Sequence, residues 1–156
     1  MDKEVTPLKA GFKWSLYSST ILLAFFGVCI LTGWFDFINA DDTKYYIVLG
    51  VGFITTLATI SGALLYFRKH NEHLLTFGEG LSIGIFMGIF TAVLLALGVF
   101  VFLSINTPDI TSITDDPSLD EDPVRLPVAL AFSTSIFTFL GFVGLSLISC
   151  LIFKKD

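Results

Sequence analysis

Four long stretches of this chain carry no charged side chain, and they constrain its fold more than any other feature of the sequence. They cover residues 15–35, 45–67, 81–105 and 128–153. Each is about 20 residues or longer, which is enough for a helix to cross a hydrocarbon core of ~30 Å. We therefore expect four transmembrane helices in a single domain that covers residues 1–156.

The composition agrees with lipid as the medium of these stretches. Apolar residues make up 54% of the chain and charged residues 15%, whereas soluble domains carry about 25% charged residues. A segment that crosses lipid must satisfy its own backbone N–H and C=O groups, and a helix does so. Barrel strands would be shorter and would alternate in polarity. The expected fold class is an all-α membrane protein.

Tryptophan and tyrosine residues mark the expected ends of the first two helices. Trp14 and Trp34 are 20 residues apart, and so are Tyr46 and Tyr66. At a rise of ~1.5 Å per residue this spacing is ~30 Å, the thickness of the hydrocarbon core. Because both side chains prefer the headgroup zone, we interpret the two pairs as interface markers. Chance placement in an aromatic-rich chain is the alternative.

Basic residues near the helix ends predict the orientation, because positive charge resists translocation across the membrane. Only Lys44 and Arg125 fall on one side of the expected membrane. The residues on the other side are Lys3, Lys9, Lys13, Arg68, Lys69, Lys154 and Lys155. We therefore expect both termini in the cytoplasm and the acidic segment 106–127 on the outer face.

The connections predict how the helices follow one another. The first two are short, and short turns hold consecutive helices as antiparallel neighbours. The result is an up-down-up-down antiparallel bundle. The third connection, residues 106–127, is longer and contains four prolines that disfavour a regular helix. These are Pro108, Pro117, Pro123 and Pro127.

The third helix is preceded by a recognisable start signal. Thr76 is followed three residues later by Glu79, the spacing of a capping box in which each side chain bonds to the other residue's backbone. The Glu79 carboxylate would also lie near the positive end of the helix dipole. A proton or cation site at Glu79 is the alternative interpretation.

A stripe of small residues runs along the third helix at intervals of four. It consists of Gly80, Gly84, Gly88, Ala92 and Ala96. In lipid, close backbone approach along such a stripe is a main source of helix packing energy. We expect this stripe to be a helix-packing interface with another helix of the same chain, and a helix of a second subunit is the alternative. Weaker candidates for the facing surface are Ala58, Gly62, Gly141 and Ser149.

Two patterns resemble metal sites weakly. His70 and His73 flank Glu72, but further strong ligands are missing nearby, so a solvated turn is the better interpretation. Residues 116–122 carry acids at alternate positions like the start of a calcium loop. They lack the glycine at position six, and Pro127 replaces the bidentate glutamate. We expect no metal and no cofactor.

The remaining candidates for chemistry are few. Cys29 and Cys150 are expected at different depths in the membrane, too far apart for a disulfide. The expected spans contain no Asp, Glu, Lys, Arg or His. Transporters and proton carriers usually keep such groups within the membrane, and no catalytic constellation can be assembled from the other residues. We therefore predict no catalytic residues.

The run of residues 66–84, from Tyr-Phe-Arg-Lys to Phe-Gly-Glu-Gly-Leu-Ser-Ile-Gly, resembles the domain-of-unknown-function family numbered 4199, small membrane proteins typical of Bacteroidota. The matching features are Arg68 at the end of one helix, Phe77 and Gly78 near the start of the next, Gly84 within it, and lysines at the end of the last helix. The acidic segment 106–127 is not part of the family pattern. The resemblance implies four helices in a bacterial inner membrane, and it implies no activity.

Together these observations predict a non-enzymatic structural or accessory subunit of a larger inner-membrane complex. Its expected partners are the lipid bilayer and other membrane subunits or further copies of itself, and no nucleic acid. A self-associating channel or small-solute carrier, with Ser, Thr and backbone carbonyls along its path, is the alternative. A membrane enzyme would have to build its chemistry from loop residues such as His70, His73 and the outer acids.

Overall fold

The structure, a computed structural model, describes residues 5–32, 34, 42–71, 75–105 and 125–153. These residues form four helices: α1 (Pro7–Leu31), α2 (Asp42–His70), α3 (Phe77–Ile105) and α4 (Arg125–Phe153). Each is long and apolar enough to cross a membrane. The prediction of an all-α fold with four helices of membrane-spanning length is confirmed.

Helix α1 begins and ends earlier than predicted. It starts at Pro7 rather than at residue 15, and it ends at Leu31, so Trp34 lies beyond it. Proline suits the first helical position because the N–H it lacks would have no partner there. The Lys9 N–H donates to Thr6 Oγ1 over 3.3 Å, which caps the first turn. The start was predicted too late because the uncharged stretch begins only after Lys9 and Lys13, which lie within the helix.

The other helices begin a few residues before the predicted spans. The largest surprise is Pro127, which was expected to exclude helix but lies in the first turn of α4. The first four N–H groups of a helix have no intrahelical partner, so a proline there removes no hydrogen bond. The acidic part of the predicted loop, residues 106–124, lies outside the described residues.

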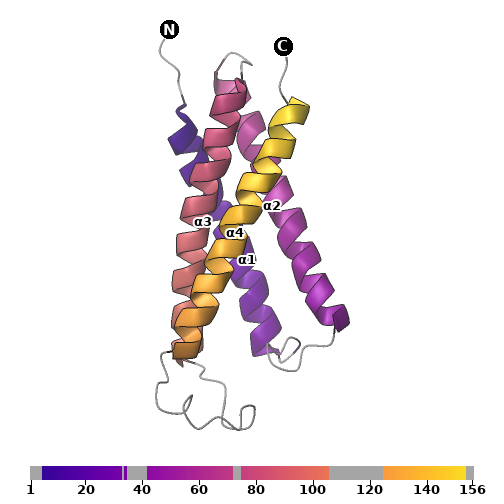
Figure 1. The fold of residues 1–156 in the computed structure, drawn as a ribbon, viewed down its shortest axis with the longest axis vertical. Helices are drawn as coiled ribbons and strands as arrows, with labels where there is room; N and C mark the ends of the chain where they lie inside the picture. Colours follow the sequence, from indigo (N-terminus) through magenta and orange to yellow (C-terminus); the bar gives the residue numbers. More distant parts are fainter. Residues whose placement is uncertain (1–4, 33, 35–41, 72–74, 106–124, 154–156) are drawn as a thin grey trace.

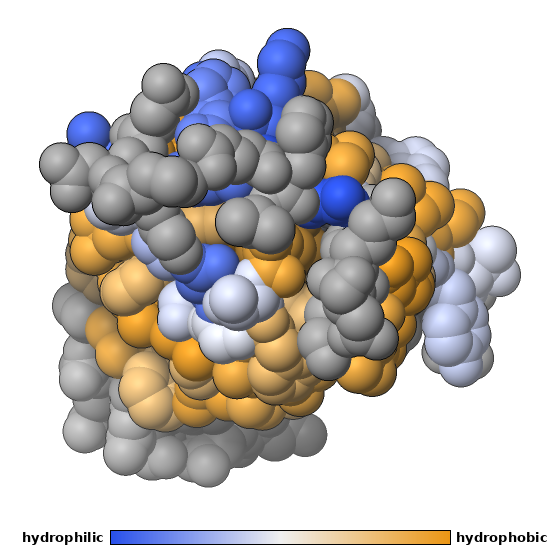
Figure 2. All heavy atoms as spheres, turned by 90° about the horizontal axis from the view of Figure 1, so that it is seen from above, coloured by the Kyte–Doolittle hydropathy of each residue, from blue (hydrophilic) through white to orange (hydrophobic). Residues whose placement is uncertain are grey.

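The helices run alternately up and down, so α1 begins and α4 ends at the same end of the bundle (Figure 1). We call this the basic end, because Lys9 and Lys13 of α1 and Arg68 and Lys69 of α2 lie there. Viewed from this end, hydrophilic residues gather on the cap of the bundle and hydrophobic residues surround its sides (Figure 2). The opposite end, where α1 and α3 finish, is the far end.

Consecutive helices are not all close neighbours. Helix α3 packs most extensively on α4 and next on α1, whereas α2 packs on α1 and α4 and touches α3 only slightly. The order around the bundle is therefore α1, α2, α4, α3, and the prediction that α2 and α3 are neighbours is wrong. The six residues 71–76 can reach up to ~20 Å when extended, enough to cross the bundle diagonally.

The core is unevenly divided between the two ends. Its larger cluster lies towards the basic end and includes Phe67, Ile83, Met87 and Phe142, all fully buried. Of the described residues, a smaller cluster towards the far end holds Cys29 and Val48, with Phe25 and Phe26 packed against them. Many large apolar side chains on the outer faces stay exposed, as expected for helices surrounded by lipid.

Trp14, which was predicted to mark the membrane interface, makes a close contact inside the bundle. It lies two turns inside α1, where its ring packs against Gly62 of α2. A Cβ on Gly62 would lie 2.5 Å from the indole ring, so only glycine leaves room for it. The Trp14 Nε1 is buried without a hydrogen-bond partner. Trp14 is therefore a packing residue between α1 and α2.

Candidate functional site

The first three residues of the small-residue stripe face α4. A Cβ on Gly80 would overlap the Cys150 side chain, and one on Gly84 would overlap Ser146. A Cβ on Gly88 would lie 3.1 Å from the Cβ of Phe142. At these positions α3 and α4 are so close that a larger residue than glycine would not fit without a shift.

The stripe continues along the same side of α3 with less close contact. Ala92 is buried, and its backbone oxygen accepts a hydrogen bond from Ser135 Oγ of α4 over 3.3 Å. Ala96 is only partly buried. The neighbour of the stripe is therefore α4 of the same chain, so this surface is not free for a second subunit.

The four weaker candidates for the facing surface lie in different places. Ser149 is buried in the bundle, and Gly62 packs against α1 instead of α3. Ala58 and Gly141 are exposed, so neither lies in an interface within the chain. The spacing of small residues does not show which neighbour each side of a helix faces. The sequence therefore could not show which of these four positions lie in an interface.

Thr76 and Glu79 bond to each other at the start of α3. The Thr76 backbone N–H donates to Glu79 Oε2 over 3.0 Å, and the Glu79 N–H donates to Thr76 Oγ1 over 3.3 Å. The Thr76 hydroxyl also donates to Glu79 Oε2 over 3.0 Å. This reciprocal pair is the geometry of a capping box, so the Glu79 carboxylate serves the helix end.

The candidate metal and redox residues are not brought together. His70 lies in the last turn of α2 with its Nδ1 2.9 Å from the Tyr66 backbone oxygen, while residues 72–74 lie outside the described residues. Among the residues that the structure describes, no three His, Cys, Asp or Glu side chains could hold a metal. Cys29 and Cys150 are free thiols in separate core clusters.

Buried hydroxyl groups form a feature that the sequence analysis did not single out. Most of them donate to a carbonyl of their own helix, as Ser19 does to Ser15 and Thr59 does to Thr55. The hydroxyls of Ser18 on α1 and Thr91 on α3 are buried and have no hydrogen-bond partner. Serine and threonine are common in membrane helices, so no sequence signal distinguishes these two.

Asn71 closes the basic end through a contact that the sequence analysis also missed. Its Nδ2 donates to the Val5 backbone oxygen over 2.9 Å, and the Val5 N–H donates to its Oδ1 over 3.4 Å. Both residues are buried. This pair joins the residues before α1 to the end of α2.

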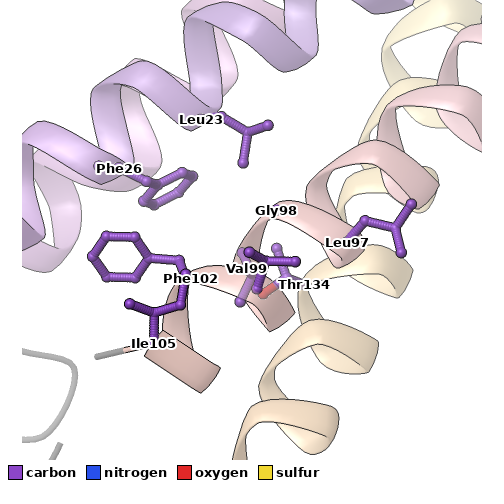
Figure 3. Close-up of a pocket in the computed structure, with 10 residues that line it drawn as sticks. Leu23, Phe26, Leu97, Gly98, Val99, Phe102, Ile105 and Thr134 are labelled. Carbon is purple, nitrogen blue, oxygen red and sulfur yellow. The ribbon is translucent and has the colours of Figure 1, made fainter. Parts of the chain in front are cut away.

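A pocket of about 540 Å³ opens between the helices towards the far end. Leu23, Phe26 and Gly27 of α1 form one wall, and residues 97–99, 101, 102 and 105 of α3 form the other. Thr134 of α4 closes the side and is the only polar side chain among the described lining residues. Figure 3 shows the rings of Phe26 and Phe102 opposite each other across the opening.

The outer face of α4 carries two glycines with open space beside them in the part of the chain that the structure describes. A Cβ on Gly141 or on Gly144 would meet no atom within 4 Å. Both are exposed, and the exposed side chains of Phe137, Leu140 and Ile148 lie on either side of them along the helix. We call this pair of exposed glycines between larger apolar side chains the α4 notch.

Comparison with known proteins adds no assignment to this geometry. No family model matches the chain, and searches of curated proteins and of solved structures found no match.

Proposed function

We propose that this small integral membrane protein is a non-enzymatic accessory subunit of a larger inner-membrane complex, and that a helix of another subunit packs into the α4 notch. The observation that carries the proposal is the outward position of Gly141 and Gly144. The stripe on α3 cannot serve this purpose because α4 already covers it.

The cost of glycine in a helix is the reason for this proposal. Each glycine destabilises a helix by ~1 kcal/mol relative to alanine. In membrane helices the compensating gain is the close approach of another backbone. Gly84 obtains this gain from Ser146, whereas Gly141 and Gly144 obtain it from none of the residues that the structure describes. A partner helix in the α4 notch would supply it.

The proposed location is a bacterial inner membrane, with the basic end on the cytoplasmic side. Four basic residues of the described chain, Lys9, Lys13, Arg68 and Lys69, lie at that end, and positive charge is retained on the side of synthesis. Membership in the family numbered 4199 remains part of this proposal and rests on the sequence resemblance alone. Labelling of a cysteine introduced at Lys9 from the outer side should fail in intact cells and succeed after the membrane is permeabilised.

Purification from native membranes in mild detergent tests the subunit proposal. We expect at least one membrane protein to co-purify with the wild-type chain and to be lost when Gly144→Leu fills the α4 notch. A Cβ at Gly144 meets nothing, so the fold should tolerate the change.

Gly50→Leu is the matched control: a Cβ at this α2 glycine also meets no atom within 4 Å, but Gly50 is half-buried whereas Gly144 is exposed. It should leave the co-purifying protein in place. A wild-type chain that purifies alone, with no crosslinked partner in native membranes, would contradict the proposal. If both variants retained the partner equally, the interface would not lie on the α4 notch.

A self-associating channel or small-solute carrier is a second candidate, favoured by one observation. The hydroxyls of Ser18 and Thr91 lie inside the bundle without a hydrogen-bond partner, and such groups can bind water or a polar solute. Flux of ions and small solutes into reconstituted vesicles tests this candidate. Flux no higher than in empty vesicles would reject it, and Thr91→Val should abolish any flux that is found.

A further inference from the structure

We propose that the pocket at the far end is a binding site for one acyl chain of a membrane phospholipid. This goes beyond the proposed role as a subunit, since it concerns a different face of the molecule. The lining is apolar apart from the Thr134 hydroxyl, and residues 97–102 belong to the part of α3 that is apolar enough to span a membrane.

The pocket is closed towards the bundle centre and widens towards the far end. A Cβ on Gly98 would overlap the Leu23 side chain, so α1 and α3 touch at this level. Figure 3 shows Leu23 pointing towards the backbone at Gly98. Gly27 lies one turn further along α1, and a Cβ there would meet nothing within 4 Å. The two helices therefore diverge from a closed point.

The depth of the pocket matches one leaflet. It runs along α3 from Gly98 to Ile105, the last helical residue. Seven residues correspond to about 10 Å at ~1.5 Å per residue. Half of a hydrocarbon core of ~30 Å is about 15 Å. A lipid with its headgroup at the far end of the bundle can therefore insert one chain lengthwise and reach the Gly98–Leu23 contact.

The size of the pocket distinguishes between possible occupants. One turn of helix, ~10 Å across and ~5.4 Å long, already fills about 400 Å³. The volume of 540 Å³ thus admits little more than one turn, far less than a helix that crosses the membrane. A methylene group takes up about the volume of a water molecule, ~30 Å³ in the liquid, so the pocket volume corresponds to roughly 18 methylene groups, which is room for one acyl chain.

The character of the lining predicts what the site selects. Water is a poor occupant because apolar cavities stay dry. None of the lining residues that the structure describes is charged, so this lining contacts the acyl chain and not the headgroup. Binding should therefore depend on the acyl chain and should change little between zwitterionic and anionic headgroups.

Photolabelling in vesicles tests the site. The probe is phosphatidylcholine with a diazirine on one acyl chain, diluted into unlabelled phosphatidylcholine, and the crosslinked residues are mapped by mass spectrometry. Residues 97–105 should be labelled several-fold more, per residue, than the outer face of α4 at residues 137–148. A phosphatidylglycerol probe should give the same pattern.

Variants that fill the pocket make the test specific. Gly27→Phe places a ring in the open space, and Thr134→Phe narrows the pocket from α4. Each should lower the label on 97–105 several-fold and leave the label on α4 unchanged. Gly144→Phe, the matched control on the outer face, should leave the pocket label intact. Thermal unfolding verifies that all three variants remain folded.

Several results would overturn the proposal. Equal labelling of 97–105 and of the α4 face in the wild type would mean ordinary boundary lipid. Undiminished pocket label in both folded filling variants would mean that the chain does not enter the pocket. A crosslink from 97–105 to a second protein chain would identify a protein occupant. Loss of a co-purifying subunit in Gly144→Leu bears on the α4 notch alone, so the two proposals fail independently.

Discussion

Two sets of glycines in this bundle are used in opposite ways. At the basic end Gly11, Gly80 and Gly84 each have a neighbouring side chain where a Cβ would stand. Towards the far end Gly27 and Gly50 face open space. The same residue type therefore lets helices approach closely at some positions and leaves open space at others. In a membrane protein the meaning of a glycine depends on what faces it, and not on its spacing alone.

The largest predicted effect concerns the contact between α3 and α4. Gly84→Leu places a side chain where Ser146 already lies, so the helices must separate along their main interface. Overpacking of this kind costs about 3 kcal/mol. Thermal unfolding in detergent should show a large loss of stability, while the exposed Gly144→Leu changes it little. Wild-type stability in Gly84→Leu would refute the close contact.

The next effect concerns the closure of the basic end by Asn71. Asn71→Ala removes both hydrogen bonds to Val5 and leaves the buried backbone N–H and C=O of Val5 unpaired. The expected cost is about 2 kcal/mol. Limited trypsin digestion should cut faster at Lys9, because the start of α1 frays. Unchanged digestion would show that the contact does not hold the N-terminal residues in place.

A smaller effect is expected at the start of α3. Glu79→Ala removes the carboxylate that accepts from the Thr76 backbone N–H. Loss of such a cap costs about 1 kcal/mol. Glu79→Gln keeps an acceptor and should recover most of the stability in the same unfolding assay. If Glu79→Gln lost as much stability as Glu79→Ala, the charge of Glu79 and not its hydrogen-bonding geometry would stabilise the helix start.

The smallest effect tests the two kinds of glycine directly. Gly50→Ala at the far end should stabilise the protein by about 0.5 kcal/mol, since alanine favours helix and nothing obstructs its Cβ. Gly11→Ala at the basic end should destabilise it, because the new Cβ would lie 2.7 Å from that of Phe86. Unfolding curves of the two variants should shift in opposite directions. Shifts of the same sign would remove the distinction between the two sets of glycines.

Much of the fold followed from the sequence because uncharged length is a strong signal in lipid. The four helices and the reciprocal geometry of Thr76 and Glu79 depend on local spacing, which the sequence displays directly. The start of α1 did not follow, since Lys9 and Lys13 interrupt the apolar pattern although the helix continues through them.

The arrangement around the bundle was harder to predict. Helix α4 lies between α2 and α3, although the short segment 71–76 suggested that α2 and α3 were neighbours. The direction of Gly141 and the pocket near Gly27 depend on the rotation and divergence of whole helices. These are properties of packing between distant segments, and neither periodicity nor composition reports them.

The central claim is that α3 packs on α4 within lipid, and disulfide crosslinking in membranes tests it most directly. Ala92→Cys and Ser135→Cys introduce a pair at the hydrogen-bonded contact between these helices, in a chain whose Cys29 and Cys150 are replaced by alanine. Mild oxidation of alkali-washed membranes should crosslink this pair efficiently within one chain. A protein that the alkaline wash removes, or an embedded protein in which the pair does not crosslink, would contradict the account.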